Sequence, residues 1–153
     1  MTSSSRGDRP SPDPFILDTS VLTAVARGDA DIIGLIQGYD GRGQPMVIPA
    51  LASAGASLDA RSEDADDLLA GLELLDSVTS APLSGAEQAS RLASVIHRTG
   101  LDPWDAHAAA IADVAICPIL TLDARKWQQP AERLDELLHV IEIADPGEQN
   151  PGK

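Results

Sequence analysis

Aromatic side chains are scarce in this sequence, which has one Phe, one Tyr and two Trp among 153 residues. A core with so few rings must be filled by Leu, Ile, Val and Ala. Such residues suit parallel strands covered by Ala-rich helices better than an aromatic-rich β-sandwich. Hydrophobic residues make up 43% of the chain, which is typical of a globular protein, and the length suits a single domain.

Cysteine is almost absent, and so are the signals of export. The single Cys117 excludes an internal disulfide and fits a reducing compartment. The sequence has no apolar N-terminal segment of a signal peptide and no run of apolar residues long enough to span a bilayer. We therefore expect a cytoplasmic protein that does not enter a membrane.

Basic residues are also few. Eleven Lys and Arg face 24 Asp and Glu, which gives a formal net charge of −13. This balance argues against a general nucleic-acid coating protein, because such a protein needs a basic face to neutralise phosphates. It is compatible with carboxylates around a hard cation or with a basic protein partner, and the net charge does not choose between them.

The organisation of the chain indicates one α/β domain. Residues 1–14 are polar and Pro-rich and predict a disordered leader, and residues 145–153 predict a flexible tail. Between them, residues 15–144 alternate short apolar runs with helical stretches. Five runs are interpreted as strands: FILD, PMVIP, VTSAPL, PILTL and HVIEI. The alternation predicts a three-layer α/β/α sandwich with a mostly parallel five-stranded sheet.

Helices are expected in the gaps between these runs. Ser84 is predicted to begin one of them in a capping box with Glu87. Asp102 is predicted to cap the next, with Pro103 at its first position. The expected helices cover residues 20–26, 31–37, 50–60, 64–76, 84–97, 103–114 and 123–138.

Two carboxylates stand where predicted strands end. Asp18 closes the run FILD, and Asp123 follows PILTL directly. The carboxyl ends of parallel strands share one edge of a sheet, where ligands of α/β proteins bind, so both side chains would open into one crevice if these strands are neighbours. The alternative is that each Asp only caps the helix that follows it.

Asp105 is the third candidate. An acid in the first turn of a helix already complements the helix dipole. However, positions 105, 108, 109 and 112 share a face whose other members are all Ala, and a carboxylate on a buried face is costly unless a cation pairs with it. Three carboxylates without a His or Cys set favour Mg²⁺ or Mn²⁺ over Zn²⁺. Such a site suits phosphodiester hydrolysis.

Four segments, in this order and spacing, carry a family resemblance: FILDTSVL, VIPALASAG, LDPWDAHAAAIAD and LTLDARKW. Together they resemble the PIN-domain family, and in particular the VapC toxins of bacterial toxin–antitoxin pairs. The resemblance covers nearly the whole core. It implies a three-layer α/β/α fold, Mg²⁺- or Mn²⁺-dependent cleavage of an RNA substrate, an antitoxin partner and a homodimer.

The resemblance also assigns residues to the site. Asp18 and Ser20 match the family's first acid and its neighbouring hydroxyl, and Asp105 matches the acid of the "DA" motif. Thr121 and Asp123 match a Thr-x-Asp motif at the end of the fourth strand. Asp18, Asp105 and Asp123 are thereby implied as catalytic metal ligands. Ser20 and Thr121 are implied as cofactor-binding hydroxyls that orient those ligands.

One departure leaves two functions open. The family places a glutamate where this chain has Gly55, and Asp59 lies one helical turn further on as a shorter substitute. The chain is therefore either a metal-dependent endoribonuclease or a catalytically degenerate binding or regulatory protein. A small-molecule phosphohydrolase has less support, because no Gly-rich phosphate loop is present.

Five further side chains are given ordinary structural roles. His107 is interpreted as a helix-surface histidine, and Arg125 and Lys126 as solvated cations in the first turn of a helix. Trp104 and Trp127 are interpreted as packing residues rather than platforms on which bases stack.

Overall fold

Five strands form the centre of the computed structural model, which describes residues 13–135 and 138–143. Each strand lies in one of the runs that predicted it. The expected leader and tail lie outside the described residues, apart from residues 13 and 14. The strands are β1 (Phe15–Leu17), β2 (Met46–Pro49), β3 (Val78–Ala81), β4 (Ile119–Thr121) and β5 (Val140–Glu142).

The sheet is parallel throughout, with the order β3-β2-β1-β4-β5. The central strand β1 pairs with β2 on one side, where Ile16 faces Val47, and with β4 on the other, where Ile16 faces Ile119. The chain adds β2 and β3 on one side of β1 and then adds β4 and β5 on the other side. The strand order therefore reverses between β1 and β4. In open α/β sheets, the crevice at such a reversal is where ligands bind.

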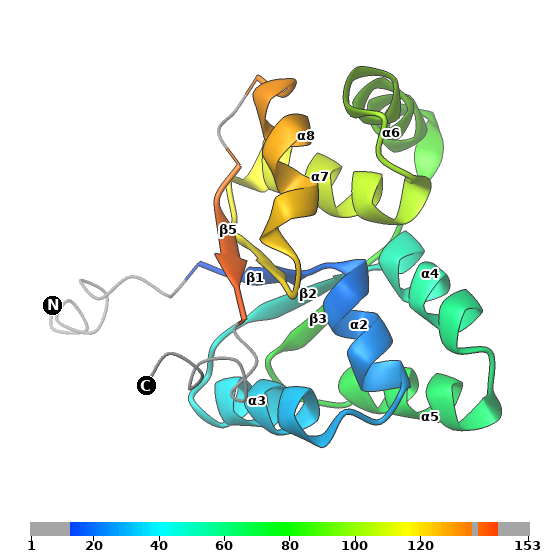
Figure 1. The fold of residues 1–153 in the computed structure, drawn as a ribbon, viewed down its shortest axis with the longest axis vertical. Helices are drawn as coiled ribbons and strands as arrows, with labels where there is room; N and C mark the ends of the chain where they lie inside the picture. The colour runs from blue at the N-terminus through cyan, green and yellow to red at the C-terminus, as the bar shows by residue number, and fades with distance from the viewer. Residues whose placement is uncertain (1–12, 136–137, 144–153) are drawn as a thin grey trace, which may run out of the picture.

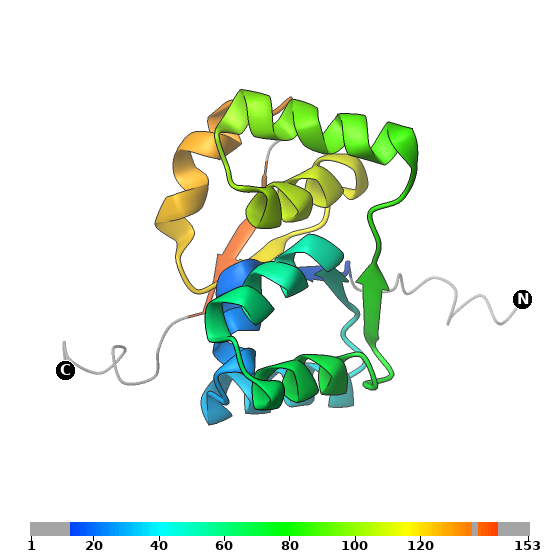
Figure 2. The ribbon, with the colours of Figure 1, turned by 90° about the vertical axis from the view of Figure 1, so that its right-hand side faces the viewer.

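Helices cover both faces of the sheet and complete the predicted three layers (Figures 1 and 2). Successive side chains of a strand point to opposite faces. Leu17 accordingly packs with the helices of one core and Ile16 with those of the other. The first layer holds α2 (Thr19–Ala26), α3 (Ala30–Gly41) and α5 (Glu63–Leu72). The second holds α6 (Gly85–Thr99), α7 (Pro103–Ala115) and α8 (Gln128–Glu132).

Helix α4 (Ala50–Ala60) joins the two layers because it packs against both α2 and α7. Its buried face consists of Ala52, Gly55 and Ala56, so neighbouring helices approach it closely. The predicted helix 123–138 is interrupted in the described residues: a 3₁₀ turn, η1 (Ala124–Trp127), precedes the short α8. Pro130 explains the interruption, because proline has no N–H and its ring clashes with the carbonyl four residues earlier.

Two capping predictions have different outcomes. Asp102 caps α7 as expected, with its Oδ1 accepting the Asp105 N–H at 3.1 Å. The capping box at Ser84 was wrong: the Ser84 side chain makes no capping bond, and its N–H donates to Gln88 Oε1 at 2.8 Å. Glu87 instead extends into solvent and forms an i,i+4 ion pair with Arg91.

The helices of the described ranges are too short or too polar to cross a membrane.

Candidate functional site

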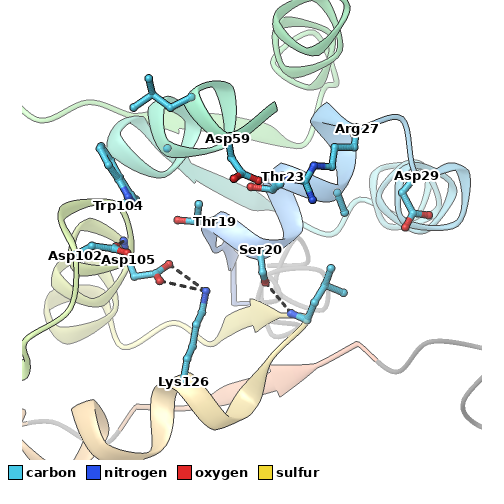
Figure 3. A pocket seen from close by; sticks show the side chains of 14 residues that line it. Thr19, Ser20, Thr23, Arg27, Asp29, Asp59, Asp102, Trp104, Asp105 and Lys126 are labelled. Carbon is cyan, nitrogen blue, oxygen red and sulfur yellow. Dashed lines mark hydrogen bonds and ion pairs between the residues drawn. The ribbon is translucent and has the colours of Figure 1, made fainter. Parts of the chain in front are cut away.

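Asp18, Asp105 and Lys126 meet at the carboxyl edge of the sheet. Asp18 directly follows β1 and is fully buried, and Asp105 lies in the first turn of α7 with 7% of its surface exposed. Lys126 comes from η1, just past the end of β4. A hollow of about 760 Å³ opens beside them, with Asp105 and Lys126 in its wall (Figure 3). The edge at which the sequence placed the site is thus the edge where these charges gather.

The ammonium of Lys126 bridges the two carboxylates. Its Nζ lies 3.1 Å from Asp18 Oδ2 and 3.2 Å from Asp105 Oδ2. The bond to Asp105 is visible in Figure 3. The interpretation of Lys126 as a solvated cation was therefore wrong. The turn of η1 directs this side chain back into the crevice, where only 24% of it remains exposed.

The carboxylate of Asp18 has no acceptor capacity left. Its Oδ1 accepts hydrogen bonds from the Ser20 hydroxyl at 2.6 Å and from the Val21 N–H at 3.1 Å. Its Oδ2 accepts one from the indole Nε1 of Trp127 at 3.0 Å and pairs with Lys126. A carboxylate offers about four lone-pair sites, and all are engaged here. Asp18 thus also caps α2, as the alternative interpretation stated.

Two hydroxyls extend this network toward β4. Ser20 Oγ accepts the Leu122 N–H at 2.9 Å and lies 3.3 Å from Thr121 Oγ1. Thr121 Oγ1 in turn accepts the Asp123 N–H at 3.0 Å. Ser20 therefore orients the Asp18 carboxylate, whereas Thr121 contacts the backbone of Asp123 and not its carboxylate. Their predicted role toward a cofactor stays a prediction.

Asp123 does not join the other two acids. Its side chain is exposed, and its Oδ1 accepts the Arg125 N–H at 3.1 Å, which makes it the cap of η1. Within residues 13–135 and 138–143, no group of three or more His, Cys, Asp or Glu side chains is arranged to hold a metal ion. The structure thus brings together two of the three predicted ligands, and the metal-binding role of Asp123 stays a prediction.

Trp104 takes up the space beside Gly55. A Cβ atom at position 55 would lie 2.6 Å from Trp104 Cγ and 2.9 Å from Trp104 Cβ, closer than real contacts allow. The resemblance implied a glutamate at this position, but the sequence did not reveal that an indole lies against the backbone there. Asp59 does not substitute for the glutamate, because it forms an ion pair with Arg27, with both side chains more than half exposed.

The charges at the site depend on one another. Burial raises the pKa of Asp105, and the nearby Asp18 raises it further, while Lys126 opposes both. Burial alone would lower the pKa of Lys126, but the carboxylates of Asp18 and Asp105 outweigh that cost and raise it. Lys126 is therefore a protonated ammonium at neutral pH, held between two acids.

His107 is buried, whereas the sequence had suggested a histidine on the helix surface. Only 3% of it is exposed, and its Nδ1 accepts the Leu51 N–H at 3.2 Å. Leu51 lies in the first turn of α4, whose N-cap Pro49 provides no side-chain bond. The imidazole thus supplies the missing cap, and burial lowers its pKa, which keeps it neutral. Trp127, by contrast, is a buried packing residue as predicted.

The site residues do not fit the Mg²⁺ or Mn²⁺ ion that the resemblance implies. A hard divalent cation requires several free oxygen ligands. Here the Asp18 oxygens are already engaged, and the Lys126 ammonium lies between the two acids. The position where the resemblance implies a glutamate is Gly55, which packs against an indole. The two carboxylates instead bind one monovalent cation from the protein itself, the ammonium of Lys126.

Comparison with known proteins finds chains of similar fold. No family model matches the sequence, and no curated protein matches it. VapBC2 from Rickettsia felis, solved bound to a DNA fragment from their promoter, superposes with a TM-score of 0.59 at 12% identity, over 85% of this chain and 98% of the other. PAE2754 from Pyrobaculum aerophilum superposes with a TM-score of 0.53 at 17% identity, over 83% of each chain. Identities this low establish the fold alone.

Proposed function

We propose that this chain, which has the VapC-like PIN fold, acts in the cytoplasm by binding a protein partner and does not cleave RNA with a metal ion. The observation that carries the proposal is the bridge from Lys126 Nζ to Asp18 and Asp105, at 3.1 and 3.2 Å. A positive charge held by the protein itself lies where the two retained acids converge.

The chemistry of phosphodiester cleavage explains why this bridge matters. A divalent cation lowers the pKa of a bound water, which supplies hydroxide at neutral pH, and it also stabilises charge on the phosphate. An ammonium supplies a single positive charge and cannot coordinate water in this way. With the Lys126 ammonium already paired with two carboxylates and no side chain at position 55, the crevice supplies neither the hydroxide nor a free positive charge for the phosphate.

The partner that we propose is an antitoxin-like protein. One structure of the same fold is that of VapBC2, and a formal charge of −13 favours a partner with a basic surface. We further propose a homodimer. Val114 and Ile116, at the end of α7, are 58% and 56% exposed and offer apolar surface for association.

A metal-dependent endoribonuclease remains the second candidate. It is favoured by the convergence of Asp18 and Asp105 at the ligand-binding edge of the sheet and by the Ser20 hydroxyl that orients Asp18. In this alternative, Lys126 would have to leave the crevice, and Asp18, Asp105 and Asp123 would hold the cation.

An RNA cleavage assay separates the two functions. The purified protein is incubated with total RNA, with and without Mn²⁺, beside the Asp105→Asn variant. The proposal predicts equal, background cleavage for both proteins, and metal-dependent cleavage that Asp105→Asn abolishes would overturn it. Co-expression with the product of the adjacent reading frame, followed by size-exclusion chromatography, tests the partner. The proposal expects one co-eluting complex, and separate elution would count against it.

A further inference from the structure

We infer that Lys126 is a covalently attached replacement for a divalent cation, and that substituting it uncovers a metal site formed by Asp18 and Asp105. This inference rests on the proposed function and deepens it, because it says how the metal-free state is maintained. It also names the one side chain, Lys126, that occupies the point between the two acids.

The geometry places Nζ where a shared ion would lie. Oxygen atoms from two separate elements, the start of α2 and the first turn of α7, converge on this one atom at 3.1 and 3.2 Å. Bonds from oxygen to Mg²⁺ are shorter, about 2.0–2.1 Å. A shift of about 1 Å by each carboxylate would therefore close both around an ion once the ammonium is gone.

The charges explain why a cation is needed at this point. Asp18 is fully buried and Asp105 is nearly so, and two neighbouring buried carboxylates repel each other unless a positive charge lies between them. Lys126 cancels one of the two negative charges. Replacing it with a neutral residue leaves both uncompensated, and replacing it with an acid adds a third. Each substitution increases the demand for a divalent cation.

An ion can reach the site from solvent. Lys126 and Asp105 both line the hollow of about 760 Å³, together with the side chains of Thr19 and Thr23 (Figure 3). Mg²⁺ and Mn²⁺ usually keep several water ligands, and an open, partly polar hollow leaves room for them. Substituting Lys126 frees one acceptor site on Asp18 Oδ2, and water in the hollow supplies the ligands that the two acids do not.

The test compares three variants with the wild-type protein. Lys126→Glu places a third carboxylate at the bridge, and Lys126→Met removes the charge while keeping the length of the side chain. Arg125→Met is the matched control, because Arg125 is an exposed cation one residue away that does not line the hollow. Mn²⁺ binding is measured by the electron paramagnetic resonance signal of the free ion, and stability by thermal unfolding with and without Mn²⁺.

The expected result is that Mn²⁺ raises the melting temperature only of the variants at position 126. Lys126→Glu should melt below the wild-type protein without metal and recover by about 3–6 °C when Mn²⁺ is about ten times its Kd. Lys126→Met should show a smaller gain. The wild-type protein and Arg125→Met should show none. Adding Asp105→Asn to either Lys126 variant should remove the gain, since it removes one of the two oxygen donors.

Two results would overturn the inference. One is a folded Lys126→Met protein that binds Mn²⁺ no better than the wild type, which remains measurable even if Lys126→Glu does not fold. The other is a gain that persists with Asp105→Asn. Neither result depends on RNA cleavage. Metal-dependent cleavage by the wild-type protein would instead contradict the proposed function, so the two failures are distinguishable.

Discussion

The indole Nε1 of Trp127 donates a hydrogen bond to Asp18 Oδ2 at 3.0 Å, across 109 positions of the chain. Lys126, the residue before Trp127, pairs with the same oxygen. A single short turn after β4 therefore delivers two donors to one carboxylate oxygen at the end of β1. The Lys126 ammonium also lies 5.5 Å from the centre of the Trp127 ring, which favours a positive charge at this position.

Trp127→Phe should destabilise the protein by about 1–3 kcal/mol, because a buried oxygen of Asp18 loses a donor and the smaller ring leaves a void. The measurement is urea unfolding followed by circular dichroism. Trp104→Phe is the control, since no hydrogen bond of the Trp104 indole is found among the described residues. An equal or larger loss in the control would show that the Nε1 bond contributes little.

Gly55→Ala should also destabilise the protein, by about 1–3 kcal/mol, because the new methyl group would overlap Trp104. Gly34→Ala is the matched control. Gly34 lies inside α3 with open space around its Cβ position, so alanine there should stabilise the protein by about 0.5–1 kcal/mol. Opposite signs of the two changes in unfolding free energy are the expected result. If Gly55→Ala is as stabilising as Gly34→Ala, Trp104 does not fill that space.

Asp18→Asn should reduce the unfolding free energy by about 3 kcal/mol, since its amide nitrogen cannot accept from Trp127 or pair with Lys126, and a partly buried ammonium loses a partner. Asp123→Asn is the control. It changes an exposed cap and should cost no more than about 1 kcal/mol. Equal losses in the two variants, measured by chemical denaturation, would contradict the burial and pairing of Asp18.

Acidification tests the buried His107. Burial lowers its pKa in the folded protein below the ordinary value of 6.5, so the unfolded chain binds a proton more readily than the folded one. Its contribution to stability is therefore present above pH 6.5 and is lost as the pH falls below that value. His107→Gln should remove this dependence. The check is unfolding free energy at a series of pH values, and parallel curves for the two proteins would show that His107 does not contribute.

The sequence predicted the five strands, the parallel sheet and the edge at which Asp18 and Asp105 meet, because those features follow from local apolar runs and from strand direction. It could not predict the role of Lys126. That role depends on the 3₁₀ turn η1, which precedes α8 and its Pro130, and on an acid 21 positions earlier in the chain. The contact between Gly55 and Trp104 could not be predicted either, because it depends on how α4 packs against α7 in the folded protein. Asp123 looked equivalent to Asp18 in sequence, yet only Asp18 points into the core.

The most direct test of the account is a crystal structure of the wild-type protein grown with Mn²⁺, with data collected for the anomalous signal of manganese. The account predicts Lys126 Nζ within hydrogen-bonding distance of both Asp18 and Asp105, and no anomalous peak between the two carboxylates. A manganese peak at that point, with Lys126 turned out into the hollow, would contradict it.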